Sequence, residues 1–187
     1  MRDAQAVMRE PLTMAPAAAG AAPADLVAAL LQARQTILPK RLGAPGPDAA
    51  QLQAMLAAAA HAPDHGCLLP WRFVLVPQAA RAALAEVFAQ ALRERDAAAT
   101  PAQQEQAREK AYRAPVLLLA VADERGGDPG IEPGERIVSA GCALQNLLLM
   151  ALPLGFGSAL TSGKALQSQA LRTLFALGEG ERALCFV

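Results

Sequence analysis

Polar side chains that could bind a metal or an organic ligand gather in one short segment of this sequence. His61, Asp64, His65 and Cys67 lie close together within the stretch 60–76. Imidazole, carboxylate and thiolate groups are metal ligands, and imidazole nitrogens also donate or accept hydrogen bonds. Prolines and a glycine interrupt the stretch, so we expect these residues to lie on a constrained loop, where binding sites are commonly built.

Three interpretations of this loop remain open. A metal site would use the two histidines together with Asp64 and Cys67, but no second group of cysteine and histidine completes a tetrahedral set. A structural role would leave the side chains in contact with their own neighbours. We favour contact with a bound ligand, because the loop lies between an expected helix and an expected strand that would hold it in place.

A second polar group follows the first expected helix. Arg34, Gln35 and Thr36 end that helix, and Lys40 and Arg41 follow on the next loop. A guanidinium presents a planar fork of donors that matches phosphate, and a hydroxyl and two further cations would add to such a clamp. The alternative is that Arg34 offsets the negative end of the helix dipole.

Hydrophobic spacing and start signals predict the elements around these two groups. Asp48 with Gln51 resembles a capping box, and apolar residues at helical spacing follow it to Ala62. Trp71 to Val76 and Val116 to Ala122 are apolar runs with the length of buried strands. The other expected elements are a helix with Asp25 as its N-cap, helices near Leu84 and from Pro101, a short strand within 155–160, a helix near Leu171 that Gly178 ends, and a strand from Arg182.

The longest helical pattern runs from Glu135 to Leu154 and is apolar nearly all round. Such a helix is expected in the middle of a domain or of a dimer. Pro153 should kink or end it. Because aromatic residues make up only 4% of the chain, the core should be thin. We therefore expect a partner subunit, and predict a homodimer.

Composition excludes several classes of protein. The 187 residues suit one domain, and 17 basic against 17 acidic residues leave no net field for nucleic acid or an anionic membrane. Three widely spaced cysteines do not suggest disulfides. No signal peptide or membrane span is evident, so we expect a cytoplasmic protein. Residues 1–24 are expected to be a flexible extension and 25–187 the domain, with a C-terminal tail missing after an apolar strand.

Four stretches, taken together, resemble the nitroreductase family of flavoproteins, above all its small members. They are Arg-Gln-Thr at 34–36, where the family has Arg-Arg-Ser, the run 62–76, the run 139–149 and the run 154–163, in the family's order. The resemblance implies an α+β fold with helices around a mainly antiparallel sheet. It also implies FMN bound at a homodimer interface, which the long central helix helps to build.

The resemblance assigns roles to individual positions. The implied FMN contacts are Arg34, Gln35, Thr36, His61, His65, Leu160, Thr161 and Ser162. The implied NAD(P) contacts are Met150, Ala151, Leu152, Pro153, Leu154 and Gly155. This chain departs from the family at two of these places, since Gln35 replaces a second cation and Leu160-Thr161-Ser162 stands where the family has a segment like Trp-Arg-Ser.

The implied activity is transfer of hydride from NAD(P)H through FMN to a nitroaromatic, a quinone or a similar small-molecule acceptor, by a ping-pong mechanism. The cofactor supplies this chemistry, and the protein supplies binding and orientation, so no catalytic side chain is expected. Two alternatives remain: an FMN-binding protein that stores or senses flavin without reductase turnover, and a metal-binding module on the histidine loop.

Overall fold

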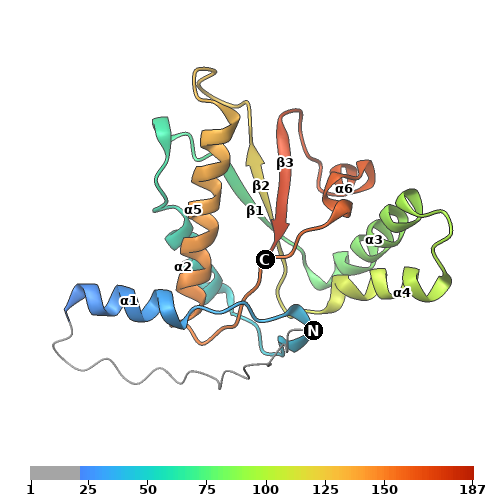
Figure 1. Ribbon diagram of the computed structural model, residues 1–187, viewed down its shortest axis with the longest axis horizontal. Coiled ribbons are helices and arrows are strands. Elements are labelled where there is room, and N and C mark those ends of the chain that lie inside the picture. The colour runs from blue at the N-terminus through green and yellow to red at the C-terminus, as the bar shows by residue number, and fades with distance from the viewer. Residues whose placement is uncertain (1–21) are drawn as a thin grey trace, which may run out of the picture.

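A computed structural model describes residues 22–187, and the expected extension over residues 1–24 lies mostly outside this range. The described chain is an α+β domain of three strands and six α-helices with short 3₁₀ turns between them (Figure 1). In chain order the elements are α1 (Pro23–Ala33), α2 (Ala49–Ala59), β1 (Trp71–Leu75), α3 (Arg81–Arg95), α4 (Pro101–Glu109), β2 (Leu118–Asp123), α5 (Pro133–Ala151), α6 (Gln169–Leu174) and β3 (Glu181–Phe186).

The strands form one antiparallel sheet in the order β1-β2-β3, so β2 lies in the centre. Phe73 of β1 pairs with Ala120 of β2, which pairs in turn with Cys185 of β3. A register shift interrupts the second pairing between Ala120 and Val121. The prediction that β2 is buried on both faces is confirmed, whereas β1 is only half buried, because it is an edge strand of the sheet.

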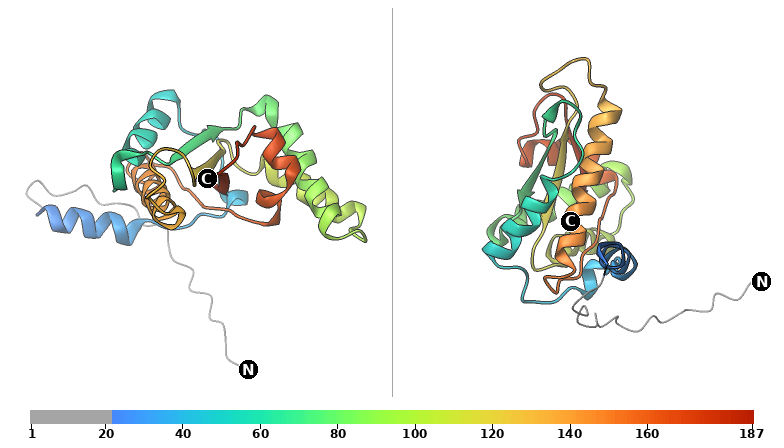
Figure 2. Two further views of the ribbon diagram at one scale, coloured as in Figure 1. Left: turned by 90° about the horizontal axis from the view of Figure 1, so that it is seen from above. Right: turned by 90° about the vertical axis from the view of Figure 1, so that its left-hand side faces the viewer.

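Helices cover both faces of the sheet and give the domain two cores (Figures 1 and 2). On one face α2 and α5 pack around Met55, Leu118 and Leu147. On the other face α3 and α6 pack around Leu84 and Leu171, with Leu119, Val121 and Phe186 contributed by the sheet. The side-chain alternation of β2 supplies both cores, because consecutive residues of a strand point to opposite faces.

Two predicted helix starts are confirmed and one is wrong. Asp48 closes the predicted capping box with Gln51, and α4 begins at Pro101 as expected, where Thr100 and Gln103 form a second capping box. Asp25 is not an N-cap, because Pro23 takes the first position of α1 and Asp25 lies in its first turn. Proline suits that position since its missing N–H would have no partner there. The folded chain therefore begins before Asp25.

Three other boundaries differ from expectation. α5 begins at Pro133 rather than Glu135, since Glu132 and Glu135 form a capping box at its start. The short strand expected within 155–160 is absent, and the described chain has there a single bridge from Ser158 to Thr36. α6 ends at Leu174, before Gly178, and Ala176 takes the left-handed backbone turn that follows. No helix within residues 22–187 is long and apolar enough to span a bilayer.

Candidate functional site

The cationic group predicted from the sequence lies just beyond α1, beside the chain that leaves α5. Thr36 forms a parallel bridge with Ser158, and the amide of Ile37 donates to the Ser158 carbonyl over 3.0 Å. Within the part of the chain that the structure describes, the guanidinium of Arg34 has no hydrogen-bond or ion-pair partner. Its backbone is extended rather than helical, so Arg34 ends α1 as its C-cap residue.

Lys40 and Arg41 follow in the 3₁₀ turn Pro39–Arg41 and are exposed. Neither side chain is paired with a carboxylate of the described residues. Three cations without counter-ions near one turn favour an anionic ligand, since like charges brought together repel unless an anion lies between them. A phosphate group, which accepts hydrogen bonds from guanidinium, ammonium and hydroxyl donors, fits this set.

The segment Leu160–Ser162 is held against the end of β3. The Thr161 amide donates to the Phe186 carbonyl and the Phe186 amide donates back to Thr161, each over 2.8 Å. Leu160 and Ser162, on either side of this pair, are exposed. Ser158, which bridges to Thr36, lies two residues before this segment. The segment therefore follows directly on the part of the chain that lies beside the cations.

The predicted NAD(P) segment from Met150 to Gly155 is the C-terminal end of α5 and the turn after it. The Gly155 amide donates to the Leu152 carbonyl over 2.9 Å, and the Phe156 amide to Ala151 over 2.9 Å. Gly155 has a φ of +87°, a conformation that favours glycine. This turn leads directly to Ser158, so the segment belongs to the same end of the molecule as Arg34.

The histidine loop lies at the other end of α5. His61 is exposed just after α2, and His65 opens the 3₁₀ turn His65–Cys67. The Nδ1 atom of His65 lies 2.8 Å from Oε2 of Glu135, in the first turn of α5. The sequence pattern around Glu135, beside a proline at a helix start, indicates only a cap and no role in the site.

The backbone of this loop is strained. Cys67 and Leu69 have φ values of 51° and 47°, in the left-handed region that non-glycine residues rarely adopt. Each such residue costs about 1–3 kcal/mol, and residues of this kind cluster at functional sites. The Asp64 carboxylate accepts from the Leu69 amide over 2.6 Å and holds the conformation in place. The strain makes this loop a candidate functional segment.

The loop 124–132, between β2 and α5, supports the histidine loop. A Cβ on Gly66 would meet Cδ1 of Ile131 at 2.7 Å, so the backbone at Gly66 lies directly against the Ile131 side chain. Arg136, which is buried, donates to the carbonyls of Ile131, Gly126 and Asp128 and fixes the supporting loop from inside. The histidine loop is therefore packed against α5 and the loop that precedes it.

One chain does not bring all of the predicted residues together. The length of α5 separates the Glu135 end, with His65, from the Ala151 end, with Arg34 and Ser158. At 1.5 Å per residue these 16 residues span about 24 Å. Within one chain the structure groups Arg34–Thr36, 150–155 and 160–162 at one end and leaves His65 at the other.

Two cavities flank the segment that follows α5. The first, of about 550 Å³, lies between the loop after α1 and the turn after α5, and Arg41 supplies the charge in an otherwise apolar lining that includes Met55, Leu147 and Phe156. The second, of about 640 Å³, is polar and is lined by Ser162, Lys164 and Arg182 among others. Both have volumes usual for small-molecule sites.

The alternative of a metal site on the histidine loop finds no support. Within residues 22–187 no three side chains of histidine, cysteine, aspartate and glutamate are arranged to hold a metal ion. Asp64 is turned to the Leu69 amide and His65 to Glu135. Two of the four side chains that such a site would use are thus directed at other partners.

The fold and the site together define a class of protein. A crystal structure of a nitroreductase-like family protein from Bacillus cereus covers 86% of this chain and 82% of its own, with a TM-score of 0.72 at 19% identity. At that identity the likeness establishes the shared fold. It confirms the predicted arrangement of helices around an antiparallel sheet.

The chain belongs to the nitroreductase family, whose sequence model matches residues 31–187. A protein of Haemophilus influenzae named "Putative NAD(P)H nitroreductase" is 36% identical over 151 residues, which are 79% of each chain. A point mutant of the FMN and NADPH-dependent nitroreductase NfnB, from Sphingopyxis sp. strain HMH, has a TM-score of 0.66 at 19% identity and covers 85% of this chain and 84% of its own. The protein is therefore an oxidoreductase.

Proposed function

We propose that this protein is a cytoplasmic, homodimeric FMN-dependent oxidoreductase that transfers hydride from NAD(P)H to a nitroaromatic, a quinone or a similar acceptor. The observation that carries the proposal is the group of cations Arg34, Lys40 and Arg41, which have no partner among residues 22–187, beside the segment 158–162. Membership of the nitroreductase family supports it, as does the name of the Haemophilus influenzae relative.

The chemistry of the available donors fits FMN. The guanidinium of Arg34, the hydroxyl of Thr36 and the ammonium of Lys40 would hold the phosphate through charge-assisted hydrogen bonds. Gln35 offers an amide in place of a further charge. Leu160–Ser162 would contact the flavin, with Thr161 fixed by its pair of hydrogen bonds to Phe186. When bound, FMN would supply the hydride-transfer chemistry that links NAD(P)H to the acceptor.

A second subunit would complete the site. If two chains pair with their α5 helices antiparallel about a two-fold axis, the Arg34 end of one helix meets the Glu135 end of the other. Such a pairing would bring His65 of the partner subunit to the same end of the site as the cations, an approach that no contact within the described part of one chain provides. His61 would approach the same flavin from the end of α2.

The surface of α5 supports such a pairing. Val138 is 67% exposed, and Gly141, one turn further along the helix, is also exposed and allows a close approach. α1 has no buried residue, and its Val27 and Leu31 are more than half exposed. Apolar surface of this extent on two neighbouring helices is typical of a subunit interface.

The chain's own residues bind and orient the reactants in this mechanism. We place NAD(P)H against the segment Met150–Gly155, at the end of α5. The donor would leave before the acceptor enters the same space, which is a ping-pong scheme. No side chain must gain or lose a proton for hydride transfer, so the rate per bound flavin should depend weakly on pH near neutrality.

The absorption spectrum of the purified protein tests the proposal first. Bands of oxidised flavin that bleach on addition of NADPH or NADH are expected. Steady-state rates at several fixed NADPH concentrations with a quinone acceptor should give parallel double-reciprocal lines. Intersecting lines would contradict the ping-pong scheme, bound flavin without NAD(P)H oxidation would indicate storage or sensing, and a colourless protein that takes up no FMN would overturn the assignment.

A further inference from the structure

The hydrogen bond between His65 and Glu135 joins the strained loop to α5 across 70 residues of sequence. The side chain of Glu135 hydrogen-bonds His65, and this contact, with the Glu132 backbone as a smaller cause, lowers the pKa of the Glu135 carboxyl. The group is therefore a carboxylate at neutral pH and can only accept a hydrogen bond. It follows that Nδ1 of His65 carries the hydrogen.

The charged groups around His65 are otherwise engaged. On its own loop the Asp64 carboxylate accepts from the Leu69 amide. On the supporting loop the Asp128 carboxylate accepts from the Gly130 amide, and the Arg136 guanidinium is taken up by backbone carbonyls. Within the described chain, Glu135 is thus the charged group that hydrogen-bonds the imidazole of His65. Because this bond uses Nδ1, the other ring nitrogen, Nε2, has no partner among the described residues.

Stability does not account for this arrangement. The side chains of His65 and Glu135 are 65% and 48% exposed, and exposed ion pairs contribute little to folding. Yet the loop that presents His65 contains two non-glycine residues with left-handed backbones, a conformation that persists only where the surroundings enforce it. The pair is better explained by the need to present one ring nitrogen at a fixed place.

We propose that Glu135 is a positioning residue of the cofactor site: it holds His65 as the Nδ1–H tautomer, so that Nε2 offers a hydrogen-bond acceptor to an N–H or hydroxyl donor of the FMN bound by the partner subunit, and not to its phosphate. The inference rests on the proposed function, because FMN is its ligand. It adds a residue to the site that acts through His65 and does not itself touch the cofactor. Fixing the tautomer through the other ring nitrogen is a general device for histidines that bind ligands.

Titration of the apoprotein with FMN, followed by quenching of flavin fluorescence, tests the inference. Glu135→Ala removes the acceptor and should weaken FMN binding about tenfold, the effect of losing one well-placed hydrogen bond. Glu135→Gln keeps an oxygen that accepts from Nδ1 and also keeps the capping box, so its affinity should stay within about threefold of wild type. Glu132→Ala is the matched control, since it breaks the same helix cap without touching His65, and it should leave the affinity unchanged.

Two further measurements separate positioning from a general structural effect. In a His65→Ala background, Glu135→Ala should cause no additional loss of affinity, because the two residues act as one unit. Imidazole ¹⁵N shifts of the apoprotein should show a protonated Nδ1 and an unprotonated Nε2 in the neutral ring of wild type, and a mixture of tautomers in Glu135→Ala.

Three results would overturn the inference: wild-type affinity in Glu135→Ala, additive losses in the double variant, or unchanged ¹⁵N shifts. Failure of the wild-type protein to bind FMN is a different outcome, and it would overturn the proposed function together with this inference.

Discussion

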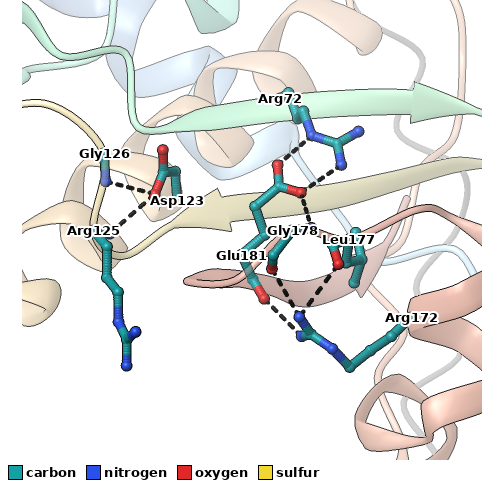
Figure 3. Close-up of polar contacts among 8 residues, drawn as sticks. All are labelled: Arg72, Asp123, Arg125, Gly126, Arg172, Leu177, Gly178 and Glu181. Carbon is teal, nitrogen blue, oxygen red and sulfur yellow. Dashed lines mark hydrogen bonds and ion pairs between the residues drawn. The ribbon is translucent and has the colours of Figure 1, made fainter.

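Arg72 and Glu181 form a double hydrogen bond that crosses the central strand of the sheet (Figure 3). The Arg72 Nε atom donates to Oε1 of Glu181 over 2.6 Å and its second terminal nitrogen to Oε2 over 2.9 Å. Glu181 also accepts from the Gly178 amide, while Arg172 donates to the Glu181 carbonyl. The pair links the two edge strands, β1 and β3, over Val121 of β2, and ties both to the turn after α6.

The first prediction concerns this pair and pH. The hydrogen bond from Arg72, with smaller contributions from the Gly178 amide and the positive charges nearby, lowers the pKa of the Glu181 carboxyl. A carboxyl with a lowered pKa in the folded state stabilises the protein above its unfolded pKa, about 4.3, and this contribution is lost as pH falls through the folded value. Glu181→Gln should lower the free energy of unfolding at pH 7 by about 1 kcal/mol, a figure reduced for the exposure of Arg72, and the difference should shrink near pH 3.

Urea denaturation of wild type and variant at pH 7, 5 and 3 measures this effect. Glu179→Gln is the control, because Glu179 pairs with Arg125 where both side chains are largely exposed, and it should change stability by only a few tenths of a kcal/mol. A Glu181→Gln variant that is as stable as wild type at pH 7 would show that the pair does not brace the sheet.

The second prediction concerns Arg34. Charge-assisted hydrogen bonds contribute roughly 1.5–3 kcal/mol each, so Arg34→Ala should weaken FMN binding about ten- to a hundredfold, with little change in stability. Arg95→Ala is a matched control, since Arg95 also lies at the C-terminal end of a helix, α3, and is exposed. If the Arg34 variant binds FMN as tightly as wild type, Arg34 does not contact the cofactor and only offsets the negative end of the helix dipole.

The third prediction concerns the interface. Val138→Glu places a charge in the exposed apolar face of α5 and should convert the dimer to monomer, with loss of bound FMN, as measured by light scattering coupled to size exclusion. Leu75→Glu introduces the same charge at an exposed position on β1, where Leu75 is 48% exposed, and should leave the dimer intact. A wild-type protein that is monomeric at micromolar concentration would contradict the model of a shared site.

The fourth prediction concerns the cysteines. Burial raises the pKa of the Cys185 thiol to about 11, so this residue stays protonated at pH 8 and should resist thiol reagents in the native protein. Cys67 is exposed on the strained loop and should react first. Mass spectrometry after brief treatment with iodoacetamide identifies the modified residue, and FMN should slow the reaction if the loop faces the flavin. Modification of Cys185 before Cys67 would contradict the burial of β3.

The sequence alone determined the parts of this protein that depend on near neighbours. Asp48 predicted the start of α2, because a capping box involves residues three positions apart, and Pro101 predicted the start of α4, because proline suits the first helical position. The apolar run of β2 predicted a strand buried on both faces. Four stretches, 34–36, 62–76, 139–149 and 154–163, together indicated the family, since they follow in the family's order.

Only the tertiary structure decided the contacts between residues that are far apart in the sequence. Glu135 meets His65 across 70 positions, and Glu181 meets Arg72 across 109; no local pattern records either contact, because each depends on how α5 and the sheet pack. The same packing sets Arg34 and His65 at opposite ends of one helix. The number of residues between Arg34 and His65 could not show this separation. The distance between them in space depends on how the chain packs along α5.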